Sequence, residues 1–368
     1  MARHVSIEPQ RLRRLLQHLI DIYSPSGKEE QILDYLHGYL QQHGLPVVPQ
    51  AVDDSRYNLV VVPPVKRLRL ALIGHVDTVA AYDLEHYGYE EEDGVVKGLG
   101  AADMKGGVAA MVEAFVSLWK AGTTQVPVAL ALVVGEEEEG DGALRLVEDY
   151  HFPWAVVAEP TNLKPCLSNY GYVEIQIRAT GKRRHASLAN QGQNPIETML
   201  HLLLKLSHYM REKLPDSVYN IRDLLSTQAG FAVPDWCEAW LDVHLPATAR
   251  MEDISLELEE IVERTRESEP QIDADIRFPT IHAGYELPEK GPLVEALRDI
   301  YRRNSLPWEP QPFPSHSDAN QLWASGVKPI LLGPGELEKA HAPDEAVSLQ
   351  QVQTAAEVYL ELLLHMCQ

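Results

Sequence analysis

Apolar positions along the first 169 residues follow two periods, which predict helices alternating with buried strands. Side chains at helical spacing cover residues 8–23 and, after the break SPSGKEE, a second helix that continues to about Gln42. Four apolar runs follow, namely RYNLVVVP, LRLALIGH, VPVALALVVG and WAVVAEP, and helical segments precede the last two. Such runs are typical of strands covered on both faces. We therefore expect an α/β domain with a mixed, mostly parallel central sheet flanked by helices.

A different pattern begins near Tyr170. The runs VEIQIRAT, WCEAWLDVHLP and IDADIRF are typical of half-exposed strands, and two amphipathic helical segments separate the three. After Pro279 the pattern typical of buried elements returns, with a helix at GPLVEALRDIYRRN, a core strand at VKPILLGPG and a closing helix. We therefore expect a larger domain formed by residues 1–169 and 282–368, with a small α+β domain inserted at residues 170–281.

The composition of the chain argues against some classes of binding partner and indicates a cellular compartment. The 368 residues carry 54 acidic and 32 basic side chains, a net charge of −22, which argues against a nucleic-acid partner. Three cysteines without a CxxC pair argue against a disulfide framework or a thiolate zinc site. The N-terminal stretch lacks an apolar signal core, and the longest apolar run is less than half of the roughly 20 residues that span a membrane. We expect a cytoplasmic protein without membrane contact.

The first candidate functional residues lie at the end of the run LRLALIGH. His75 and Asp77 stand two residues apart, so on an extended strand end their side chains point to the same side. The stretch GLGAADMKGG sets Asp103 on a tight turn ahead of a helix. Such a turn also suits a phosphate, and a lone histidine is more often an ordinary side chain. Asp103, however, stands where a dinucleotide loop needs its third glycine, and its charge repels a pyrophosphate. We therefore expect His75 and Asp103 to share a metal.

Three further features follow predicted core strands. VPVALALVVG runs into four glutamates at 136–139, which in isolation are as readily a solvated acidic turn. WAVVAEPT leaves Glu159 at a strand end, and GPGELEKAHAPDE places His341 beyond another strand. The carboxyl ends of the strands in an open α/β sheet form its ligand crevice. Two histidines and three carboxylates are thus expected at one sheet edge: His75, Asp103, Glu137, Glu159 and His341.

The motifs GHVDTV, GLGAADMKGG, the glutamate run, AEPT, GKRRHAS and AHAPDE occur in this order along residues 24–347. Their series resembles the co-catalytic zinc family of acetylornithine deacetylase, succinyl-diaminopimelate desuccinylase, aminoacylase and glutamate carboxypeptidase. The resemblance implies a catalytic α/β domain and an inserted lid domain that commonly forms a homodimer. It also implies two metal ions per subunit, for which imidazole and carboxylate ligands favour Zn²⁺ but also suit Co²⁺ or Mn²⁺.

The resemblance implies one role for each of the five candidate ligands. His75 and Glu159 hold one metal, and Glu137 and His341 hold the other. Asp103 bridges them, because two cations about 3.5 to 4 Å apart need an anion between them to offset their repulsion.

Three further roles follow from the same resemblance. Asp77 accepts the second ring N–H of His75 and fixes its tautomer. Glu136 is the general base, which takes a proton from the attacking water and passes it to the leaving amine. His185, which otherwise is a histidine on a basic loop, reaches the active site of the partner subunit and donates to the oxyanion.

The four glutamates leave two registers open. Counting back from the glycine–alanine pair at 142–143 makes Glu136 the base and Glu137 the ligand. Counting from Gly140 gives Glu137 and Glu138 instead. We adopt the first register.

The chain departs from the family pattern at the positions that usually hold the substrate carboxylate or carbonyl. Phe231 stands where relatives often carry an asparagine, and His244 stands where they carry an arginine. A histidine is a weaker, pH-dependent donor, so a substrate with an α-carboxylate needs another cation. The candidates for that cation are Arg183, Arg184 and Arg250. His316 replaces a common glycine in SHSDANQL, where it either contacts the substrate or is an ordinary loop histidine.

These observations predict a dinuclear metal-dependent amidohydrolase that cleaves an N-acyl amino acid, with two Zn²⁺ ions per subunit. An exopeptidase or dipeptidase acting on short peptides shares every catalytic residue and stays the alternative. More distant alternatives are a non-hydrolytic metal-binding protein and a nucleotide-binding oxidoreductase.

Overall fold

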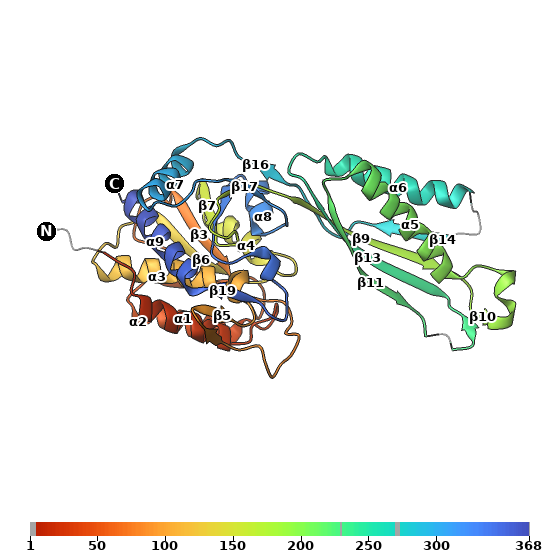
Figure 1. The fold of residues 1–368 in the computed structure, drawn as a ribbon, viewed down its shortest axis with the longest axis horizontal. Coiled ribbons are helices and arrows are strands. Elements are labelled where there is room, and N and C mark those ends of the chain that lie inside the picture. The colour runs from red at the N-terminus through yellow and green to blue at the C-terminus, as the bar shows by residue number, and fades with distance from the viewer. Residues whose placement is uncertain (1–4, 229, 269–272, 368) are drawn as a thin grey trace. The chain divides into compact units, whose positions relative to one another are not determined.

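The computed structural model describes residues 5–228, 230–268 and 273–367, and the chain divides into two compact units (Figure 1). The first unit comprises the chain up to Ser168, Leu287–Phe313 and the chain from Ser317 onward. The second comprises Asn169–Glu286 and Pro314–His316. The second unit therefore contains more of the chain than the insertion expected at residues 170–281. His316 belongs to it and stacks on Tyr172, with ring centroids 4.1 Å apart.

The first unit is organised around a mixed sheet with the strand order β1-β2-β6-β3-β7-β18-β8, in which β17 also pairs with β8. The four central strands run parallel to one another: β6 (Val128–Val133), β3 (Leu70–His75), β7 (Trp154–Val157) and β18 (Lys328–Leu331). The remaining strands are β1 (Val47–Ala51), β2 (Tyr57–Val61), β8 (Cys166–Asn169) and β17 (Gln311–Phe313). Every position of β3 and β6 is buried, which explains why their sequences are almost continuously apolar.

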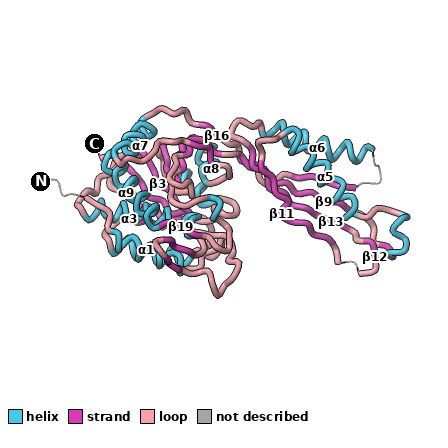
Figure 2. The backbone as a smooth tube through the Cα atoms, viewed as in Figure 1, coloured by secondary structure: helices cyan, strands magenta, loops and turns pink. Residues whose placement is uncertain are grey.

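Helices surround the strands of this unit (Figure 2). They are α1 (Pro9–Asp21), α2 (Glu30–Gln42), α3 (Gly106–Lys120), α4 (Asp141–Asp149), α7 (Pro292–Arg303), α8 (Asp318–Ala324) and α9 (Leu349–Met366). The central α3 packs against α1, α9, β3 and β6, and α4 packs against α8, β2 and β6. A small separate sheet is formed by β4 (Glu90–Glu92), β5 (Val95–Lys97) and β19 (Ala346–Ser348). No helix in the described part of the chain is long and apolar enough to cross a bilayer.

The second unit contains an antiparallel sheet with the strand order β11-β13-β9-β14, in which β15 also pairs with β9. The strands are β9 (Gly171–Thr180), β11 (Val218–Ser226), β13 (Trp236–Leu245), β14 (Asp273–Arg277) and β15 (Ile281–His282). Helix α5 (Pro195–Lys213) packs on β9 and β13, and α6 (Met251–Ser268) packs on β14 and α5. Smaller elements are β10 (Arg184–His185), β12 (Ala232–Val233) and β16 (Tyr285–Glu286). Burial alternates strictly along β13, because only one face of the sheet is covered by the helices.

The predicted fold class is confirmed, and the long periodic segments lie within one to three residues of their predicted places. Two exposed segments are among the elements that were not predicted. Strand β11 forms an edge of the second sheet, and residues 90–97 form the hairpin β4–β5. Both segments are largely exposed, so neither carries the buried apolar run by which a core strand is recognised.

Candidate metal centre

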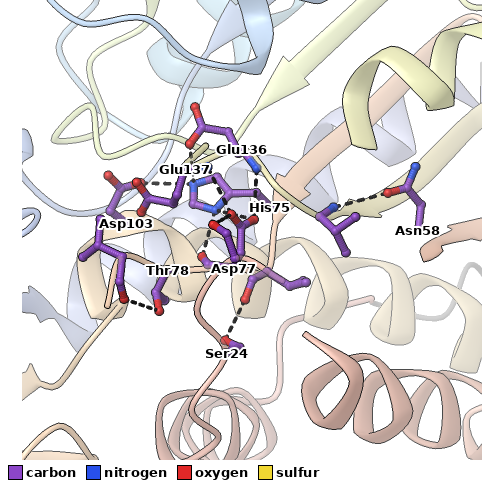
Figure 3. Close-up of polar contacts among 12 residues, drawn as sticks. Ser24, Asn58, His75, Asp77, Thr78, Asp103, Glu136 and Glu137 are labelled. Carbon is purple, nitrogen blue, oxygen red and sulfur yellow. Dashed lines mark hydrogen bonds and ion pairs between the residues drawn. The ribbon is translucent and has the colours of Figure 1, made fainter. Parts of the chain in front are cut away.

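The five candidate ligands all lie in the first unit, on loops that follow the parallel strands or precede α3. His75 is the last residue of β3, and Glu137 and Glu159 follow β6 and β7. His341 lies beyond β18, after a short helical turn at Leu337–Lys339. Asp103 lies in the segment Ala101–Lys105, which leads directly into α3. Figure 3 shows His75, Asp103 and Glu137 gathered at one place with Asp77 and Glu136.

The ring of His75 is buried and is held at both nitrogens. Its Nδ1 lies 3.0 Å from the backbone carbonyl oxygen of Asp77, which can only accept a hydrogen bond. In the neutral ring the proton is therefore on Nδ1 and the lone pair is on Nε2. That Nε2 lies 3.3 Å from Oδ1 of Asp103 and 3.8 Å from Oε2 of Glu136. His75 thus presents its unprotonated nitrogen, the one that could bind a metal, toward two carboxylates.

Asp77 lies beside Nδ1 of His75 with both its backbone carbonyl and its carboxylate, and the carbonyl is the closer of the two. Its carboxylate lies 3.6 Å from Nδ1 of His75, which is too long for a strong hydrogen bond, so the ring N–H is taken by the Asp77 backbone carbonyl instead. The Asp77 carboxylate accepts the backbone N–H groups of Glu136 and Glu137, at 3.2 and 3.0 Å, and the Ser26 hydroxyl at 2.8 Å. Asp77 therefore orients the glutamate loop with its side chain and His75 with its backbone.

The carboxylate of Asp103 belongs to two sets of side chains that could bind a metal, and each set is called a donor group below. Its Oδ1 faces Nε2 of His75, and its Oδ2 lies 3.6 Å from Nε2 of His341. The donor atoms of His75, Asp103 and Glu159 lie within 4.8 Å of one another, and so do those of Asp103, Glu137 and His341. Two potential metal sites therefore meet at one aspartate.

The loops that carry Glu159 and His341 have unusual backbone features. A Cβ atom on Gly333 would lie 2.3 Å from the carbonyl oxygen of Ala158, and one on Gly107 would lie 2.4 Å from it. These two glycines let their loops press on the residue before Glu159. His341 has a φ of 58°, a left-handed conformation that is uncommon for a residue other than glycine.

The four glutamates of the run point in different directions. The side chain of Glu137 is only 6% exposed, and its Oε2 lies 3.0 Å from Nε2 of His341. The side chain of Glu136 is 11% exposed and reaches toward His75 without joining either donor group. Glu138 and Glu139 are exposed. This arrangement gives the two inward-facing glutamates different surroundings, although they are neighbours in sequence.

Buried acids crowd this centre and shift one another's ionisation. Burial and the charges of Glu159, Glu137 and Asp318 raise the pKa of Glu136 well above its usual range, and burial and Asp103 do the same for Glu159. The hydrogen bond to Glu137 raises the pKa of His341 to about 9. Burial lowers the pKa of His75, but the carboxylates around it outweigh that effect and raise it overall. Burial and mutual repulsion thus disfavour the ionised forms of these carboxyl groups unless positive charge lies beside them.

The donor set fits a pair of divalent cations. Each group combines one imidazole with carboxylates, which suits zinc, cobalt or manganese. The fully buried Oε1 of Glu159 has no hydrogen-bond partner among the described residues. An orphaned buried carboxylate oxygen is costly, and a cation beside it would remove that cost. A cation at this centre would also favour the ionised forms of the carboxyl groups whose pKa burial raises.

Three functional neighbours were missed by the sequence reasoning. Glu345 is 3% exposed and accepts backbone N–H groups from the Asp103 segment. Burial raises the pKa of Asp318 to about 7 and lowers that of the Lys105 ammonium to about 7. Glu345 and Lys105 stand inside motifs already singled out, AHAPDE and DMKGG, so a search for buried charges near ligands would have found them.

His185 lies in the second unit, on β10. The short β10–β12 pairing sets His185 opposite Ala232. Its Nδ1 accepts the backbone N–H of Ser187 at 3.2 Å, which leaves the proton of the neutral ring on Nε2. In that tautomer the Nε2–H of His185 is a hydrogen-bond donor.

The residues at the departures from the family pattern also lie in the second unit. The ring of His244 packs against Tyr172 and His316, with centroids 5.3 and 5.6 Å away. Burial lowers the pKa of His244, against the smaller opposing effect of Asp242, so this ring is uncharged at neutral pH. Phe231 is 90% exposed.

Two of the three candidate replacement cations pair with nearby residues of the chain. Arg184 donates to the carbonyl of Gln191, and Arg250 pairs with Asp253.

An α/β sheet whose strand ends carry two donor groups joined by one carboxylate is the architecture of a two-metal hydrolase. The comparison with known families agrees. Residues 71–365 match the model of peptidase family M20/M25/M40, and the chain belongs to this family of metal-dependent hydrolases. The family resemblance drawn from the motifs is thereby confirmed.

Relatives with known activities align over nearly the whole chain. Succinyl-diaminopimelate desuccinylase of Corynebacterium glutamicum is 28% identical over 371 residues, covering 95% of each chain. Acetylornithine deacetylase of Edwardsiella ictaluri is 26% identical over 362 residues, covering 92% of this chain and 91% of the relative. The fold is also similar to that of a tripeptidase from Staphylococcus aureus, with a TM-score of 0.80, 21% identity and coverage of 98% and 100%.

Proposed function

We propose that this hydrolase cleaves the amide bond of an N-acyl amino acid, as an acetylornithine deacetylase does. The observation that carries the proposal is the shared Asp103 carboxylate, with one imidazole on each side of it and Glu136 held nearby but outside both donor groups. Relatives named as deacetylases and desuccinylases align over more than nine-tenths of the chain, which supports the deacylase branch.

In this proposal two Zn²⁺ ions, or Co²⁺ or Mn²⁺, occupy the centre. His75, Asp103 and Glu159 hold one ion, and Asp103, Glu137 and His341 hold the other. When bound, the metals supply Lewis acidity toward the substrate carbonyl and make a water reactive at neutral pH.

The proton transfers fall to Glu136. A general base must lie within reach of the attacking water, and its pKa should lie near the working pH. Burial and neighbouring acids raise the pKa of Glu136 above its usual range, which makes this carboxylate a stronger base. It accepts the water proton and returns it to the leaving nitrogen, so the amine departs neutral.

His185 stabilises the developing oxyanion in this proposal. Ser187 contacts Nδ1 of His185, so the proton of the neutral ring is on Nε2. The Nε2–H donates to the substrate oxygen as negative charge builds. We assign this role to the histidine of the partner subunit in a homodimer formed by the inserted unit, which also acts as the lid.

An exopeptidase acting on short peptides is the second candidate. The uncharged His244 does not separate the two candidates, because an N-acyl amino acid and a peptide both carry an α-carboxylate. The structural similarity to a tripeptidase fits this alternative as well as the deacylase branch.

The test is a substrate panel on the purified, metal-loaded protein. We expect release of free amino acid from N-acetyl or N-succinyl amino acids, measured as new primary amine. Hydrolysis of dipeptides or tripeptides alone would assign the exopeptidase activity instead. Metal binding without turnover on either panel would indicate a non-hydrolytic metal-binding protein.

A further inference from the structure

Glu345 links two loops that carry different candidate ligands. It follows His341 by four residues, and its side chain is turned inward, so the residue is only 3% exposed. Its Oε2 accepts the backbone N–H of Gly100 at 2.8 Å. Its Oε1 accepts those of Ala102 and Asp103 at 2.9 and 3.0 Å. One carboxylate thereby takes up three donors of the loop that bears the shared aspartate.

The loop held by Glu345 needs such support. Gly100 has a φ of 76°, and Asp103 departs from helical geometry, with φ −120° and ψ 93°. Backbone amides in irregular, buried segments require partners outside regular secondary structure. The backbone carbonyl of Glu345 also accepts the N–H of Gly98 at 3.1 Å, so both its main chain and its side chain clamp this loop.

The clamp sets the spacing inside the second donor group. His341 Nε2 lies 3.6 Å from Oδ2 of Asp103, and the two residues come from separate loops. Their direct contact joins only flexible ring and carboxylate ends. Glu345 joins the backbones of the two loops, and charge-assisted bonds from backbone N–H to carboxylate are among the stronger hydrogen bonds in proteins.

We infer that Glu345 is a positioning residue for the metal pair. It holds the backbone of Asp103 at a fixed distance from the His341 loop, so that the shared carboxylate addresses both cations. This inference rests on the proposed two-metal centre. Residues that orient metal ligands affect affinity strongly, and their replacement typically costs about 10- to 100-fold in metal affinity or activity.

The test is the substitution Glu345→Gln, which keeps the side-chain shape. A glutamine amide has one accepting oxygen, and its NH₂ group faces backbone N–H groups as a second donor, so it cannot satisfy all three. Zn²⁺ affinity and stoichiometry are measured by titration calorimetry on metal-free protein, and Co²⁺ absorption reports the ligand geometry. We expect about 10- to 100-fold weaker binding of at least one ion and a changed Co²⁺ spectrum.

Glu113→Gln is the matched control. Glu113 is also a fully buried glutamate of the first unit, but its carboxylate accepts from Arg11, Ser117 and the backbone N–H of Glu8. Its replacement should lower the melting temperature and leave Zn²⁺ affinity and the Co²⁺ spectrum unchanged. Equal loss of metal affinity in both variants would show that Glu345 contributes only to the general stability of the fold, which would overturn the inference.

The remaining outcomes separate the inference from the proposed function. Wild-type binding of two ions together with unaltered binding by Glu345→Gln overturns the positioning role alone. Failure of the wild-type protein to bind two ions overturns the two-metal centre itself. If Glu345→Gln does not fold, Glu345→Asp keeps the charge but shortens the reach, and wild-type affinity in that variant likewise contradicts the inference.

Discussion

At the scale of single residues, neighbours in sequence are separated by what they contact. Glu136 and Glu137 are adjacent, yet Glu137 bonds to His341 while Glu136 reaches toward His75 from outside both donor groups. Asp77 sets this difference, because its carboxylate holds the two backbone N–H groups of the pair. The register adopted from the sequence is therefore the one that we carry into the proposed mechanism.

Glu136→Gln is expected to abolish turnover while leaving both metals bound. An amide cannot accept the water proton, and a positioned general base contributes typically 10²- to 10⁴-fold to the rate. The measurement is kcat on the best substrate of the panel, with metal content by elemental analysis. Glu138→Gln, at an exposed position, is the matched control and should keep nearly full activity. Normal turnover in Glu136→Gln, or loss of a metal from it, would contradict the assignment of the base.

At the scale of elements, β11 is a long strand of the second unit that the sequence analysis did not predict. It is a nine-residue edge strand with large exposed apolar side chains: Val218, Ile221, Leu224 and Leu225. Exposed apolar edges promote association with another strand, and proteins usually cover or pair them. A second copy of the same strand, running antiparallel, can place Ile221 opposite Leu224 twice. We propose this pairing as the contact of the homodimer.

Lysines at both positions, Ile221→Lys with Leu224→Lys, are therefore expected to convert a dimer into a monomer, because like charges oppose one another across the pairing. The measurement is the mass by light scattering after gel filtration or by analytical ultracentrifugation. The monomer should also lose turnover while it keeps both metals, since the partner's histidine is absent. Leu84→Lys, at an exposed site in the first unit, is the control. A monomeric wild-type protein would end the proposal.

At the scale of the whole molecule, the buried acids of the first unit make stability depend on metal and pH together. Burial raises the pKa of Asp318 from 3.8 and that of Glu345 from 4.5, in each case to about 7. A carboxyl group with a raised pKa binds more protons in the folded than in the unfolded chain. Its contribution to stability is therefore present at low pH and is lost as the pH rises toward the folded pKa.

The melting temperature of the metal-free protein is therefore expected to fall between about pH 4.5 and about pH 7. The metal-loaded protein should fall less, because the cations stabilise ionised carboxylates and bind only the folded state. Scanning calorimetry with and without a chelator measures both curves. The lowered pKa of His244 acts in the opposite sense, but equally on both samples, so their difference isolates the metal centre. A difference that does not grow with pH would contradict this account.

Much of this molecule follows from local pattern. Buried strands such as β3 and β6 are apolar along their whole length, and helices such as α5 repeat at 3.6 residues, so their places are visible without coordinates. The candidate ligands were visible for the same reason, since each lies directly after such an element or inside a motif. The edge strand β11 and the hairpin at residues 90–97 were not, because exposed strands carry no burial pattern.

The sequence by itself determined the fold class, the family and the set of side chains that could bind metal, because these depend on residue type and order along the chain. Only the tertiary structure decided how the side chains are used. It showed that Asp103 faces both histidines, that the Asp77 carbonyl lies closer than its carboxylate to Nδ1 of His75, and that Glu345 clamps the Asp103 loop. Such contacts join residues up to 245 positions apart, and no local pattern encodes distances of that kind.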